Sequence, residues 1–131
     1  MTYACHCSSC QKRTGSAFSM GLVTLEANCQ IDGIMTSWTR VSDNGVKNTR
    51  YSCTACGNII YGASPGMEGL LKLQAGLMDN RCEISPDAHI WMAAKQTWFT
   101  AASNVPQFDE QPDPLTLLAA AQSYQNSGSK L

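Results

Sequence analysis

The chain of 131 residues carries a formal net charge of −1 and is 44% hydrophobic but only 15% charged. These values exclude a highly charged disordered chain and argue against a general nucleic-acid binder, which needs a basic face. The longest apolar runs have five residues, so the sequence predicts one globular domain with no membrane-spanning helix.

The N-terminal segment contains three closely spaced cysteines in a C-x-C-x2-C run, Cys5, Cys7 and Cys10. Sulfur atoms two or three residues apart can converge on one ion at about 2.3 Å. The run has no apolar signal-peptide core before it, and in a reducing compartment clustered thiols bind metal more often than they pair. The spacing favours zinc, with thiol redox chemistry and incidental packing as the alternatives.

Strand-like segments fill the middle of the chain. We expect strands over 19–26, 34–41, 46–52 and 58–62, with turns at 31–33 and at Ser42–Gly45, where Asn-Gly is a strong hairpin signal. A less regular alternation follows over 70–78, and 90–94 has the apolar character of a central strand.

A second cysteine pair, Cys53 and Cys56, lies between the strands predicted over 46–52 and 58–62 and is followed by Gly57. This C-x2-C knuckle also favours zinc, because a redox pair of this spacing is expected at the start of a helix. Cys29 and Cys82 stand alone and are expected to be small buried hydrophobes.

The end of the chain changes character after Val105, where prolines punctuate a polar, extended arm. Asp113 and Pro114 are typical of a helix N-cap and first helical position. A short helix is therefore expected over 115–124, with Leu115, Leu118, Ala119 and Gln122 on one face. The sequence thus predicts a mainly β domain over 1–112, pinned by metal, and a C-terminal helix and tail over 113–131.

The two histidines have no clear role from the residues alone. His6 lies between two cysteines in an expected turn and is predicted to be a surface side chain, with a metal ligand as the alternative. His89 lies in an apolar segment and is predicted to be a core or edge histidine, with a catalytic role as the alternative.

The segment CHCSSCQKRTGSAF, residues 5–18, strongly resembles the signature of the glutathione-dependent formaldehyde-activating enzyme family, which includes centromere protein V-like proteins. Further similar motifs follow in order: RYSCTACG at 50–57, QAGLMD at 74–79, AHIW at 88–91 and PQFD at 106–109. The resemblance therefore extends over roughly residues 5–112.

The resemblance implies a zinc-pinned β-tent, made of small antiparallel sheets, with two metal sites. Cys5, Cys7 and Cys10 would form the functional, catalytic site, and Cys53 and Cys56 would be structural ligands. The family's structural site also takes a C-x-C pair from a longer N-terminal segment, which this sequence does not have. The Cys53/Cys56 site is then empty, completed by other cysteines, or completed by a second chain. A sheet edge exposed at the N-terminus would favour a homodimer.

The function implied is that of a zinc-dependent carbon–sulfur lyase, which reversibly adds a thiol such as glutathione to an aldehyde such as formaldehyde. The alternative is a zinc-stabilised interaction module without chemistry; a zinc-ribbon nucleic-acid binder is disfavoured by the near-neutral charge. No membrane partner is expected, and the cytoplasm is the expected location.

The sequence does not assign substrate-binding residues. Glutathione carries two carboxylates, for which the chain offers several cations, namely Lys12, Arg13, Arg40, Arg50 and Lys72. His6, His89 and Asp79 are the candidates for a general acid or base.

Overall fold

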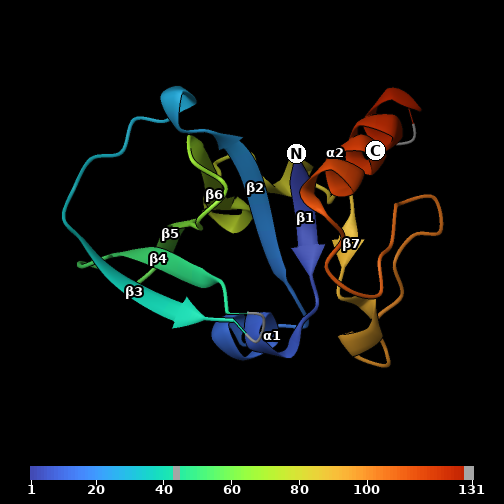
Figure 1. Ribbon diagram of the computed structural model, residues 1–131, viewed down its shortest axis with the longest axis horizontal. Coiled ribbons are helices and arrows are strands. Elements are labelled where there is room, and N and C mark those ends of the chain that lie inside the picture. Colours follow the sequence, from blue (N-terminus) through green and yellow to red (C-terminus); the bar gives the residue numbers. More distant parts are fainter. Residues whose placement is uncertain (43–44, 129–131) are drawn as a thin grey trace.

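The computed structural model describes residues 1–42 and 45–128 (Figure 1). Its strands are β1 (Thr2–Cys5), β2 (Ser19–Leu25), β3 (Met35–Val41), β4 (Lys47–Cys53), β5 (Ile59–Ala63), β6 (Leu70–Gln74) and β7 (His89–Ile90). Its α-helices are α1 (Ser8–Thr14) and α2 (Pro114–Asn126). Short 3-10 turns are η1 (Glu26–Asn28), η2 (Ala75–Leu77), η3 (Arg81–Glu83) and η4 (Met92–Ala94).

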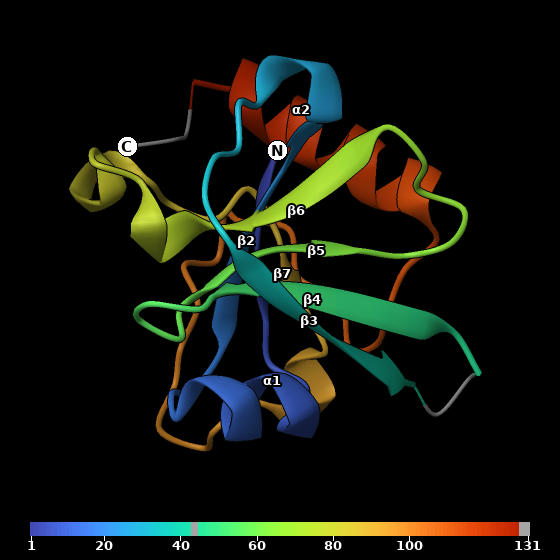
Figure 2. The same ribbon diagram turned by 90° about the vertical axis from the view of Figure 1, so that its left-hand side faces the viewer.

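The strands join in one sheet with the order β3-β4-β5-β6-β2-β1-β7. Neighbours are antiparallel except β1 and β7, which run parallel with Ala4 opposite His89 and Cys5 opposite Ile90. The sheet curls, so that β4 and β2 face each other and α1 closes the lower end of the space between them (Figures 1 and 2). The prediction of a mainly β chain with a C-terminal helix is confirmed, and the strands form one curved sheet in place of several small ones.

Local sequence predicted the β3–β4 hairpin well. The two strands pair from Met35 opposite Cys53 to Val41 opposite Lys47. Gly45 N–H donates to the Ser42 carbonyl at 2.8 Å, as expected for a turn here. The central part of the predicted turn, Asp43 and Asn44, lies outside the described residues.

The prediction of a central strand over 90–94 is wrong. The strand is β7, only His89 and Ile90, and it lies at an edge of the sheet. Trp91 adopts a left-handed backbone conformation with φ 61°, which turns the chain out of the strand and into η4. The strand predicted over 70–78 similarly ends at Gln74, where η2 begins.

Helix α2 begins as predicted but buries a different face. Asp113 accepts hydrogen bonds from the N–H groups of Leu115 and Thr116 at 3.1 and 3.0 Å. The buried side chains are Leu117, Ala121 and Tyr124, whereas Leu115 is 79% exposed. Neither this helix nor α1 has the length and apolar character needed to cross a membrane.

The core lies around β1, where the two ends of the chain meet. Cys5, Ala88, Ile90 and Leu117 form one buried cluster. Asp87 is fully buried beside it, and its carboxylate accepts from Thr2 N at 2.7 Å, Thr2 Oγ1 at 3.0 Å and Gln125 Nε2 at 2.8 Å. One carboxylate therefore connects the first strand, the segment before β7 and helix α2.

The exposed edge expected beside the first strand is absent, because β1 pairs on both sides. Within the described chain the sheet ends at β3 and β7. Strand β3 is the more open edge, and Trp38 on it is 61% exposed. The homodimer stays a prediction, but the N-terminal edge on which it was based is paired.

Candidate functional site

Three sulfur atoms meet where β1 passes into α1. Cys5 ends β1, Cys7 is the N-cap of α1, and Cys10 lies one turn later. Their Sγ atoms all lie within 4.8 Å of one another, and among residues 1–42 and 45–128 no other group of three potential metal ligands meets this test. Cys5 is buried and the other two are partly exposed. The structure therefore brings together the three residues that the sequence predicted.

The start of α1 favours a thiolate at Cys7. Its Sγ accepts from the Cys10 backbone N–H at 3.4 Å. Hydrogen bonds from the Cys10 and Cys5 thiols lower the pKa of Cys7 to about 2, whereas hydrogen bonds to Cys10 and Cys7 and burial raise the pKa of the Cys5 thiol. Cys7 is therefore the first of the three thiols to lose its proton, and the Cys5 and Cys10 thiols donate hydrogen bonds to its thiolate.

One arginine lies beside the cluster, and a second contacts the first turn of α1. Arg13 Nη2 lies 3.8 Å from Cys10 Sγ and donates to Ser19 Oγ at 2.8 Å. Arg40 Nη1, from β3, donates to Ser9 Oγ at 2.6 Å and connects the edge of the sheet to α1. Nearby guanidinium groups stabilise thiolates over thiols, and thiolates are the form that binds a metal. The donor set therefore fits a metal ion, with three protein ligands.

The second cysteine pair has a different environment. Cys53 ends β4 and is half-buried, and Cys56 is exposed in the turn before β5. Backbone N–H groups of Cys56 and Ala55 lower the pKa of the Cys53 thiol. Within the described residues no third potential ligand joins these two. The pair offers two ligands of a site that needs others for completion.

The two histidines form a buried pair that the sequence did not predict. His6 is fully buried, so its predicted surface position is wrong, and its Nε2 lies 3.0 Å from His89 Nδ1. Its ring packs against Phe18 and Phe99 at centroid distances of 5.2 and 4.6 Å. His6 is not part of the metal-ligand group. His89 is 5% exposed, which confirms its prediction as a core or edge histidine.

Burial and the neighbouring His6 lower the pKa of His89 to about 4. The unfolded chain binds a proton near pH 6.5, so the folded protein loses stability as the pH falls from 6.5 toward 4 and keeps it fully above 6.5. We expect this dependence, on the order of 2 kcal/mol, to be reduced in His89→Asn, which keeps an acceptor near Nδ1; the remainder comes from His6, whose pKa burial also lowers.

The measurement is the urea midpoint from pH 4 to 7.5, made on the protein as purified and after chelation, because acid also releases metal from thiolates. Equal slopes for wild type and His89→Asn under both conditions would contradict the assignment.

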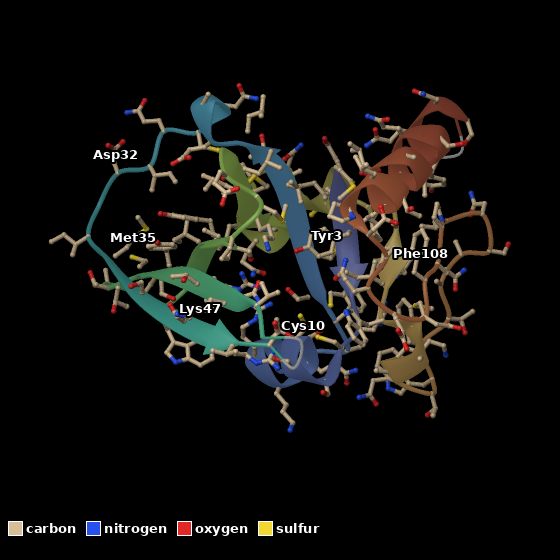
Figure 3. The ribbon with its side chains drawn as sticks, in the orientation of Figure 1. Tyr3, Cys10, Asp32, Met35, Lys47 and Phe108 are labelled. Atoms are coloured by element: carbon tan, nitrogen blue, oxygen red, sulfur yellow. The ribbon has the colours of Figure 1, made fainter. Side chains whose placement is uncertain are left out.

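The face of the sheet that carries Cys5, here named the polar face, also carries Tyr3. Residues directly opposite in register point to the same side of a sheet. Tyr3 lies opposite Gly21, whose added Cβ would come within 2.7 Å of the Tyr3 ring, so the ring lies flat across β2. Figure 3 labels Tyr3 at β1 and Cys10 at α1, at the lower end of the space between β4 and β2. Tyr3 was not predicted from the sequence, although its i, i+2 spacing to Cys5 was a usable signal.

Other predicted residues lie away from this face. Cys29 is only half-buried and Cys82 is exposed, so neither is the buried hydrophobe expected. Asp79 is exposed in the segment after η2. Lys12 is exposed on α1, where it lines a shallow hollow of about 640 Å³ together with Ser16 and Trp98. None of the three clustered cysteines lines that hollow.

Comparison with known proteins agrees with the geometry of the cysteine cluster. The chain matches the family described as glutathione-dependent formaldehyde-activating enzyme over residues 1–94, which include the cluster, the Cys53/Cys56 knuckle and the whole sheet. A search of curated proteins found no match. The matched span covers well over half of the chain, so this protein belongs to the glutathione-dependent formaldehyde-activating enzyme family.

Proposed function

We propose that this protein is a zinc-dependent carbon–sulfur lyase that reversibly adds a thiol such as glutathione to an aldehyde such as formaldehyde. The observation that carries the proposal is the convergence of Cys5, Cys7 and Cys10 in a chain of this family. These three cysteines hold the reactive zinc, while Cys53 and Cys56 supply two ligands of a structural zinc. Thiolate donors suit zinc, and three protein ligands leave a position open.

The reaction is an addition across a carbonyl group. A bond forms between the thiol sulfur and the aldehyde carbon, and the proton released by the thiol goes to the former carbonyl oxygen. The reverse reaction breaks the carbon–sulfur bond and returns the proton. Zinc, when bound, supplies a centre that holds sulfur as thiolate.

The protein's own groups contribute charge and hydrogen bonds. Burial raises the pKa of Tyr3 to about 12, so its phenol stays protonated at neutral pH and remains a hydrogen-bond donor on the polar face. Arg13, beside Cys10, stabilises negative charge at the cluster. His89 stays neutral because burial holds its pKa near 4, so it does not act as a cationic acid.

The test measures how fast the formaldehyde carbon exchanges between free formaldehyde and its glutathione adduct. A rate is needed because this adduct also forms without a catalyst. Glutathione and ¹³C-formaldehyde are mixed at equilibrium, and the rate is measured by NMR exchange with the purified protein. Zinc-loaded protein should accelerate exchange in proportion to its concentration, chelated protein should leave the buffer rate, and added zinc should restore the acceleration. A buffer rate with fully zinc-loaded protein would instead favour a non-catalytic, zinc-stabilised interaction module.

The cytoplasm is the proposed location. Cys53, which is half-buried, and Cys56, which is exposed, are free thiols. Such thiols stay reduced and able to bind metal in a reducing compartment.

A further inference from the structure

The polar face holds positive charge, and the described strands that form it carry no acidic residue. Lys72 on β6, Gly62 on β5 and Arg50 on β4 are directly opposite one another, so the two cations form a row across three adjacent strands. Tyr3 and Cys5 belong to the same face, on β1.

Arg50 lies over Gly62 in this row. A Cβ added at Gly62 would collide with Arg50 Nη1, so the missing side chain of the glycine is what makes room for the guanidinium. Arg50 Nη1 is buried and has no hydrogen-bond partner within the described residues. A buried donor without an acceptor is costly, and for a charged group the cost is larger. The guanidinium therefore has a donor that is directed at no acceptor of the protein.

Lys72 lies next to Arg50 and is held by neutral groups. Its Nζ donates to Ser64 Oγ at 2.6 Å, and Ser64 Oγ in turn donates to Asn48 Oδ1 at 2.6 Å. Burial and the charge of Arg50 lower the pKa of Lys72 to about 8, so most of it is still protonated at neutral pH. Neither neighbour neutralises this charge.

Arg50 lies near the cysteine cluster. Burial lowers its pKa, and the charges of Tyr3, Arg13, Cys10 and Cys5 also act on it, so an anion at Arg50 would lie close to the cysteines. A divalent metal with three thiolates carries one net negative charge, whereas Arg13, Arg50 and Lys72 together carry three positive charges. The metal-loaded site therefore remains net positive, and its positive excess lies on the sheet, beside the cluster.

We propose that Arg50, Lys72 and Tyr3 form an anion site that holds a carboxylate of the thiol substrate while its sulfur is at the cysteine cluster. The assignment of the carboxylate to a thiol rests on the proposed function. A guanidinium offers paired N–H donors that match a carboxylate, the Lys72 ammonium adds a point charge, and the phenol adds a third donor. Arg50 and Lys72 are each partly exposed, although Arg50 Nη1 itself is buried, so an anion would approach from the exposed side of the row.

The experiment separates the carboxylate from the sulfur. Purified, metal-loaded protein is titrated by calorimetry with glutathione, with S-methylglutathione, which keeps both carboxylates but has no thiol, and with cysteamine, which has a thiol but no carboxylate. Arg50→Met keeps an unbranched apolar stem and removes the guanidinium with its unpaired Nη1 donor. It should weaken glutathione and S-methylglutathione binding by roughly 10- to 100-fold and leave cysteamine binding and metal content within about twofold of wild type.

Lys12→Met is the matched control, because it removes the same charge from an exposed position on α1. It should change the affinity of all three compounds by less than about twofold. Lys72→Met, measured in parallel, should weaken the two carboxylate compounds in the same direction, so the test does not depend on the folding of one variant.

Two results would overturn the anion site even if the protein catalyses thiol addition. One is that wild type does not bind S-methylglutathione. The other is that wild type, Arg50→Met and Lys72→Met bind it equally well. Loss of S-methylglutathione binding in the two variants would support the anion site even if no thiol adduct is processed. The two proposals can thus fail independently.

Discussion

Replacing Cys7 by serine should release the metal from the cysteine cluster. Serine is a good N-cap, so α1 keeps its start, but a neutral hydroxyl is a poor substitute for the thiolate that Cys7 forms most readily among the three. Removing a residue that only hydrogen-bonds to a metal ligand typically lowers metal affinity 10- to 100-fold. We therefore expect removal of a ligand itself to lower metal affinity at least about a hundredfold. Any acceleration of adduct exchange should fall to the buffer rate.

The measurement is metal content per chain with thiol titration, before and after dialysis against a mild chelator. Cys82→Ser serves as the matched control, because Cys82 is exposed and lies outside the cluster. It should retain wild-type metal content. A Cys7→Ser protein that keeps its metal through dialysis would show that the cluster is not the metal site.

The second large effect is expected at Asp87. Asp87→Ala removes the acceptor of three hydrogen bonds and leaves the Thr2 N–H buried without a partner. Hydrogen bonds to charged groups contribute about 1.5–3 kcal/mol, so we expect a loss of about 3 kcal/mol in the free energy of unfolding. For a chain of this size that lowers the melting temperature by about 10 °C.

Thermal and urea unfolding of Asp87→Ala and Thr2→Val, alone and combined, measure this effect. The two substitutions share partners, so their effects should be clearly less than additive. Asp109→Ala, at an exposed position, is the control and should stay within about 0.5 kcal/mol of wild type. Full additivity, or a loss at Asp87 no larger than at Asp109, would show that the carboxylate does not connect β1 to α2.

What the sequence predicted correctly depends on neighbouring residues. Cys5, Cys7 and Cys10 converge because one helical turn brings Cys10 back to Cys7. The β3–β4 hairpin and the Asp113 cap likewise result from signals a few residues apart. Such local rules leave little freedom for an alternative arrangement.

The missed features depend on distant segments. His6 is buried because β7 and Phe99 cover it, and nothing near His6 in the sequence indicates this cover. The strand predicted over 90–94 failed because Trp91 has a left-handed conformation that tryptophan rarely adopts. The row from Arg50 to Lys72 could be predicted only from the register of three strands. A shift of one residue in that register would have moved both side chains to the other face.

The position of β1 between β2 and β7 has a consequence for how the protein is made. The β1–α1–β2 segment holds the three clustered cysteines, and its two strands can pair as soon as residues 1–25 have left the ribosome. In contrast, β7, Asp87 and α2 are synthesised much later. During translation the three clustered thiols can therefore come together while the side that β7 and α2 later occupy is still uncovered. A metal ion captured at this stage would shield them from oxidation before the sheet is complete, so metal supply during synthesis should determine how much of the protein matures with its thiols intact.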